Sequence, residues 1–150
     1  MNKEFVMRGK TASGTQEVLN FTGNTPGYAY RLVELTIYPS SGIGSTNAEL
    51  AVSITAAKTY EDPSNPNFKN EGLIAVAMLG MRSDIQNGQF LDHTIVNDTF
   101  LITQDLILAA VDTLSGSPMA VNWQCKFVGE KLGSGEEAVA NFKQFTIFDE

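Results

Sequence analysis

The sequence contains very few residues of the kinds that build catalytic and metal sites. Its 150 residues include one cysteine, Cys125, and one histidine, His93. A single cysteine excludes a disulfide within the chain and a cysteine-rich metal cluster. A single histidine makes a histidine-based zinc site or a Ser-His-Asp triad hard to assemble. We therefore expect a protein that is not an enzyme, and we assign no catalytic, cofactor-binding or metal-binding residue.

Long apolar runs are also missing. No run approaches the ~18–20 residues of a membrane-spanning helix, and no apolar stretch near the start resembles a signal peptide. These features predict a protein that does not enter a membrane.

Charged residues are scarce and mostly acidic. They make up 18% of the chain, and 17 acidic against 10 basic residues give a net charge of −7. This sign disfavours nucleic acid as a partner, because such binding needs lysine and arginine opposite phosphates. The one local basic excess is Lys3, Arg8 and Lys10, opposed by Glu4. A solvated first strand is the favoured interpretation, and a basic arm that contacts an acidic neighbour is the alternative.

Apolar alternation with a period of two is abundant. Met119, Val121, Trp123, Cys125 and Phe127 fall on one face of an extended segment, with polar residues between them. This pattern predicts a strand with one buried face. We expect Trp123 and Phe127 in the core, and Cys125 to be buried as a small apolar residue.

Similar runs, separated by turn residues, predict at least seven strands. The candidates are residues 3–9, 15–21, 28–38, 49–60, 72–80, 90–96, 99–111 and 118–130. No amphipathic helices of 10–15 residues alternate with them, which disfavours a parallel α/β fold. The predicted fold is all-β: a single antiparallel two-sheet sandwich domain over residues 1–150, jelly-roll-like. Ser134 and Glu137 form a capping box that predicts one short C-terminal helix over 135–143, before a final extended segment at 145–148.

Several candidate sites have simpler explanations. Glu61, Asp62, Asn65 and Asn67 carry oxygen atoms that suit calcium, but their spacing is not that of an EF-hand, and turn formation explains them without an ion. The glycine pairs at 42–44 and 133–135 lack the spacing of phosphate-binding loops.

His93 and Cys125 are weak catalytic candidates. Asp92 and His93 could begin a proton relay, but no nucleophile motif accompanies them. Cys125 has only Lys126 beside it, on the opposite strand face, and a reactive thiol needs nearby positive charge and exposure.

A strip of tyrosines allows three interpretations. Alternation places Tyr28, Tyr30, Glu34 and Tyr38 on one face of a strand, with Arg31 nearby. The strip could stack on sugars, form a protein contact, or be an ordinary edge of the core.

Five stretches give the chain a family likeness. They are residues 8–21 (RGKTASGTQEVLNF), 27–35 (GYAYRLVEL), 65–74 (NPNFKNEGLI), 97–105 (NDTFLITQD) and 136–145 (EEAVANFKQF). With this patterning, the chain resembles the small β-rich virion structural proteins of marine tailed phages. The resemblance implies a capsid-associated or decorating role in the virion, on a jelly-roll-like sandwich present in many copies. It implies a homo-oligomer that contacts other capsid proteins, and it transfers no functional residue.

The alternative function is a carbohydrate-binding β-sandwich module of a phage fibre or adhesin, and a glycan is expected as a partner only in that case. For the assembly function, we expect the contacts to come from an N-terminal arm at residues 2–10 and from the 61–72 loop, because these segments are the least suited to a closed core.

Overall fold

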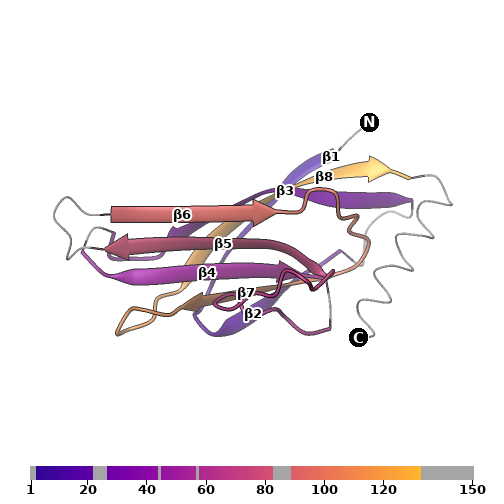
Figure 1. Cartoon of the computed structure of the whole chain (residues 1–150). Helices are drawn as coiled ribbons and strands as arrows, with labels where there is room; N and C mark the ends of the chain where they lie inside the picture. Colours follow the sequence, from indigo (N-terminus) through magenta and orange to yellow (C-terminus); the bar gives the residue numbers. More distant parts are fainter. Residues whose placement is uncertain (1–2, 22–26, 44, 57, 83–88, 133–150) are drawn as a thin grey trace.

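The computed structural model describes residues 3–21, 27–43, 45–56, 58–82 and 89–132 (Figure 1). Eight strands lie in these ranges: β1 (Lys3–Thr11), β2 (Thr15–Leu19), β3 (Tyr28–Pro39), β4 (Ala48–Thr55), β5 (Leu73–Arg82), β6 (Gln89–Val96), β7 (Leu106–Asp112) and β8 (Val121–Lys131). The all-β prediction is confirmed for these ranges, which hold no helix long and apolar enough to cross a membrane. The helix predicted over 135–143 and the extended segment at 145–148 lie outside the described residues.

The strands form two antiparallel sheets, as predicted. One has three strands in the order β1-β8-β3, and the other has five in the order β2-β7-β4-β5-β6 (Figure 1). The first strand pairs with the last, the second with the seventh and the fourth with the fifth. Strands far apart in sequence therefore lie side by side. The three-stranded sheet is built from both halves of the chain, because its central strand β8 lies between β1 and β3.

The core lies between the sheets. β8 contributes Trp123, Cys125 and Phe127, whose exposed fractions are 5%, 0% and 0%, and β4 contributes Val52 and Ile54, both fully buried. The prediction for Trp123 and Phe127 is therefore confirmed. Full burial of such side chains stabilises a fold by roughly 1.5–3 kcal/mol each.

β1 is an integral strand, as the candidate over 3–9 predicted, and the expectation that this segment is ill suited to a closed core is wrong for residues 3–10. Residues 3–11 pair with β8 along their whole length. Phe5 stacks on Phe127 with ring centroids 5.3 Å apart, and it meets the Tyr30 ring edge-on at the same centroid distance. Met7 also packs against the core. The segment joins the fold because Phe5 and Met7 point inward and are apolar, while Arg8 and Lys10 fall on the other face.

Four strands are shorter than the sequence indicated, and one of them is β2, which ends at Leu19 instead of at residue 21. β4 ends at Thr55, before the loop over 56–72, and β8 begins only at Val121. The strand expected over 99–111 begins at Leu106, although Ile102 makes an isolated bridge to Tyr30. Several apolar residues just outside the strands, such as Phe21, Ile102 and Met119, are also buried. Their apolar character extended the predicted strands beyond the observed ends.

Candidate functional site

The tyrosine strip does not exist as predicted, because β3 contains a bulge. The register between β3 and β8 shifts between Leu32 and Glu34. A one-residue shift reverses the direction of every later side chain. Tyr30 therefore points into the core, where it is 6% exposed, whereas Glu34 and Tyr38 are exposed on the outer face. Leu32, two positions after Tyr30 and also before the bulge, points the same way and is fully buried.

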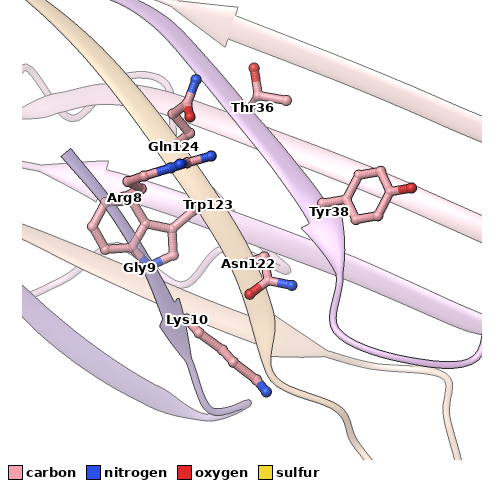
Figure 2. Close-up of a pocket in the computed structure, with 8 residues that line it drawn as sticks. All are labelled: Arg8, Gly9, Lys10, Thr36, Tyr38, Asn122, Trp123 and Gln124. Atoms are coloured by element: carbon pink, nitrogen blue, oxygen red, sulfur yellow. The ribbon is translucent and has the colours of Figure 1, made fainter. Parts of the chain in front are cut away.

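A polar groove lies on the outer face of the three-stranded sheet, near the end of β1 (Figure 2). Its volume is about 680 Å³, within the roughly 300–1,000 Å³ of small-molecule sites. Arg8 and Lys10 come from β1, Tyr38 from β3, and Asn122 and Gln124 from the central strand β8. The remaining lining residues are Gly9, Thr36 and Trp123.

No described residue neutralises the positive charges of the groove. Within the described ranges, Arg8 and Lys10 form neither an ion pair nor a side-chain hydrogen bond. Two other cations of this sheet are paired: the Lys126 ammonium lies 3.7 Å from the Glu4 carboxylate, and the Arg31 guanidinium lies 2.8 Å from that of Glu130. The sheet therefore has a charge-compensated part and an uncompensated cationic part.

The underside of the groove is built from a tryptophan against a glycine. The Trp123 indole N–H donates a hydrogen bond to the Thr11 hydroxyl at 2.9 Å. A Cβ on Gly9 would lie 2.6 Å from the Trp123 ring, closer than two non-bonded carbon atoms can approach. Gly9 thus lets the ring lie directly against β1, and the hydrogen bond fixes its orientation. The groove rests on a rigid support.

The outer face of the five-stranded sheet is apolar at its β5–β6 end. Its exposed side chains are Phe68, Met78, Leu91 and Ile95, which together with the half-buried Val76 are here called the apolar face. Phe68, Leu91 and Ile95 are each more than half exposed, at 59%, 56% and 55%. A small hollow of about 170 Å³ lies between Phe68, Val76 and Ile95. Exposed apolar residues in contact with one another mark interaction sites.

β6 carries two large apolar side chains on the outer side of the sheet, Leu91 and Ile95. Leu91 pairs with Gly80, and Ile95 pairs with Val76, on the outward side of the sheet. β6 is the outermost strand of its sheet. Among its inward positions, Val96 is half-buried against the core, whereas Asp92 and Thr94 stay exposed. The sequence pattern cannot show this, since it is the same as that of a strand with a buried face.

The 61–72 segment is a loop, as predicted, and its acidic oxygens serve the loop itself. The Glu61 carboxylate accepts hydrogen bonds from the Asn67 backbone N–H at 2.7 Å and from the Asn70 amide at 2.9 Å. Asp62 accepts from the backbone N–H and the hydroxyl of Ser64. No group of three or more acidic, histidine or cysteine residues gathers among the described residues. These bonds account for the composition that suggested calcium.

His93 and Cys125 lie apart from each other and from the groove. His93 is exposed on β6, opposite Met78 and next to the apolar face. Cys125 is fully buried, and burial raises the pKa of its thiol to about 12. A thiol with so high a pKa stays protonated near neutral pH, where the thiolate is the nucleophile. The structure brings neither residue toward a catalytic partner among the described residues.

One organising residue escaped the sequence analysis. Asp112, only 5% exposed, accepts a hydrogen bond from the buried Met119 N–H at 3.1 Å, and others from the backbone N–H groups of Leu114 and Ser115. Its carboxylate therefore shapes the connection from β7 to β8, between the two sheets. The available signal was an aspartate directly before the polar turn residues at 113–118.

Comparison of the chain with protein-family models, with curated proteins and with solved structures finds no match. The basis for a functional proposal is therefore the fold and the two outer faces.

Proposed function

We propose that the chain is a non-enzymatic virion structural protein, capsid-associated or decorating, that acts through self-association and contacts with a shell lattice. The family resemblance of the sequence suggests this role, and the topology supports it. The pairings β1–β8, β2–β7 and β4–β5 are those of a ribbon rolled into a jelly roll, a fold used by viral capsid and lectin domains. β6 pairs with β5 only, which gives sheets of three and five strands instead of four and four.

The observation that carries self-association is the apolar face. We assign a second copy of this chain as the partner that covers the apolar face, because two copies with the same net charge can meet most easily where the surface carries almost no charge. The chain carries a net charge of −7, so most surfaces of two copies repel each other. The outward positions 76, 78, 80, 91, 93 and 95 include no acidic or basic residue other than His93. A patch that is apolar and self-complementary suits an isologous contact.

The 61–72 loop is the proposed second element of assembly. Phe68, at its exposed tip, belongs to the apolar face, while Glu61 fixes the loop from within. The loop is anchored to β4, where the Ser53 hydroxyl donates to the Glu61 carbonyl at 2.6 Å. A contact residue held in a fixed loop loses little entropy on binding. Weak contacts of this kind act together in a lattice of many copies.

Sedimentation velocity of the purified chain tests this function. The parent is expected to form oligomers, and the double variant Leu91→Lys/Ile95→Lys is expected to weaken association at least tenfold, because each interface would bury lysines. The matched control is Val18→Lys, which adds a lysine at a 65%-exposed apolar position on β2, and it should associate like the parent. Quantitative mass spectrometry of purified virions whose genome encodes the chain should find a fixed number of copies of it per copy of the shell protein. A monomeric parent absent from virions contradicts the proposal.

A second candidate function is a carbohydrate-binding module of a phage fibre or adhesin. The predicted strip is divided by the β3 bulge, so Tyr30 cannot take part. Tyr38 remains, 58% exposed beside the polar groove, and an exposed aromatic ring offers an apolar surface and a hydroxyl to a sugar. This function would be supported if the parent binds an oligosaccharide and the Tyr38→Ala variant does not. Whether the chain associates with itself is a separate question.

A further inference from the structure

The polar groove combines three kinds of group that one class of ligand uses together. Arg8 and Lys10 supply positive charge, Asn122 and Gln124 supply amides, and Tyr38 supplies an exposed ring. We infer that the groove binds an acidic oligosaccharide, with a sugar carboxylate at Arg8 and Lys10. This inference rests on the second candidate function, which it sharpens to a ligand class, and it is independent of self-association through the apolar face.

The charge of the groove points to an anion. Arg8 and Lys10 lie two positions apart on β1, so both project from the outer face, and both are exposed and unpaired among the described residues. Unneutralised neighbouring cations repel each other, and a carboxylate between them relieves that repulsion. The planar guanidinium of arginine also matches a carboxylate with two parallel hydrogen bonds. The strongly acidic remainder of the chain disfavours a long polyanion such as nucleic acid.

The other walls of the groove point to a polyhydroxylated ligand. The amides of Asn122 and Gln124 each offer donors and an acceptor, the combination that sugar hydroxyls require. The Asn122 amide donates to the Pro39 carbonyl at 3.3 Å, which orients the side chain. Tyr38 lies opposite Lys10 across β8, since both residues pair with Asn122 (Figure 2). Peptides that bind in apolar grooves or along a free strand edge use features that this groove, which lies across three paired strands and is lined largely by polar residues, does not combine.

The position of these groups on a sheet favours binding over chance proximity. Each residue is held by strand pairing, and the Trp123 ring supports the groove from below. Because strand pairing fixes the backbone, only the side chains have to be ordered when the ligand binds, which limits the entropy that binding costs. The open shape of the groove fits a short chain of sugars bound along the sheet.

Isothermal titration with trigalacturonate tests the inference, with galactotriose as the neutral counterpart. Trigalacturonate is expected to bind, and galactotriose at least tenfold more weakly. Raising the salt from 20 to 500 mM should weaken trigalacturonate binding, because salt screens exposed charges. Arg8→Gln and Tyr38→Ala should each weaken it at least tenfold. The control Lys69→Gln, which removes one exposed charge from the 61–72 loop, should bind like the parent. Thermal melts check that all variants fold.

The outcomes separate the two levels of the proposal. Equal binding of galactotriose overturns the acidic class while supporting glycan binding. Binding of a polyglutamate peptide that Arg8→Gln abolishes, without binding of either sugar, overturns the inference in favour of an acidic protein partner. Absence of binding by all three probes also overturns it. Sedimentation of the same samples reports on self-association separately.

Discussion

The two outer faces of the molecule are opposites in chemistry, although the same kind of alternation builds both. The three-stranded sheet presents Arg8, Gln124 and Tyr38 outward, whereas the five-stranded sheet presents Leu91 and Ile95. In β8 the apolar positions Trp123, Cys125 and Phe127 face the core, whereas Leu91 and Ile95 of β6 face away from it. Alternation therefore identifies a strand without telling which side is buried. That choice depends on what covers the strand, which only the tertiary structure decides.

The opposite placement of these faces fits the two proposed roles. The hydrophobic core separates them, so a partner on the apolar face leaves the polar groove free. A chain that binds its own copies or a shell through one sheet could present the other to a glycan outside. Either role can fail in experiment without the other, which makes the comparison between the faces testable.

The largest effect is expected from insertion of one alanine between Leu35 and Thr36 of β3. The insertion reverses the side chains on one side of it, so either Tyr30 and Leu32 leave the core or Ile37 does. Exposing such core residues should consume most of the ~5–15 kcal/mol that stabilises a typical domain. We expect an unfolded chain by circular dichroism.

Deletion of Val33, the extra residue of the β3 bulge, is the matched control. Leu32 and Glu34 pair with adjacent residues of β8, so removing Val33 keeps the side chains before and after it on their present faces, and the variant should stay folded. A folded insertion variant, or an unfolded Val33 deletion, would contradict the role of the bulge.

Trp123→Ala is expected to have the next largest effect and to damage the polar groove from below. Removing a buried tryptophan costs about 3–5 kcal/mol. Trp123→Phe keeps most of the ring but leaves the Thr11 hydroxyl without its 2.9 Å donor, and should cost about 1–3 kcal/mol. Urea denaturation of both variants measures the difference. Equal stability of Trp123→Ala and the parent would mean that this face of β8 is not buried.

The sequence predicted more of the strands than of their arrangement. The number of strands, the burial of Trp123 and Phe127 and the 61–72 loop were predictable, because alternation and turn residues report on local structure. The bulge in β3 was not, since Val33 is an unremarkable β-branched residue in a run of alternating ones. The apolar face and the polar groove were not predictable either. Both depend on which strands become neighbours, as when β1 brings Arg8 beside Gln124 of β8.

Asp112→Ala should have an intermediate effect, because the residue stabilises the connection between the two sheets. The substitution leaves the buried Met119 N–H without an acceptor and frees the turn that Leu114 and Ser115 form. Loss of such bonds to a carboxylate costs about 2–3 kcal/mol. Asp112→Asn keeps one acceptor oxygen and should cost about half as much. Thermal unfolding measures both, and variants as stable as the parent would show that the turn forms without the carboxylate.

The smallest effect is expected at Cys125, which lies in the core between the two faces. Burial raises the pKa of its thiol to about 12, from 9.0 in an exposed thiol. At pH 7 the thiol is protonated in both the folded and the unfolded chain, so its ionisation contributes nothing to stability. Above pH 9 the unfolded chain loses the proton first, and the free energy of unfolding should fall by at most about 1.4 kcal/mol per pH unit until the folded pKa is reached.

Two measurements check this sign. Tyrosines and lysines also titrate above pH 9, so the slope of stability against pH is compared with that of Cys125→Ala, which lacks the thiol and should show a shallower decline. At pH 8 the folded chain should react with iodoacetamide far more slowly than the chain in urea, since the thiolate is the reacting species. Rapid labelling of the folded chain at pH 8, or identical slopes for the two proteins, would place Cys125 in a more open environment than the core between the sheets. It would also reopen the question of chemistry at this residue.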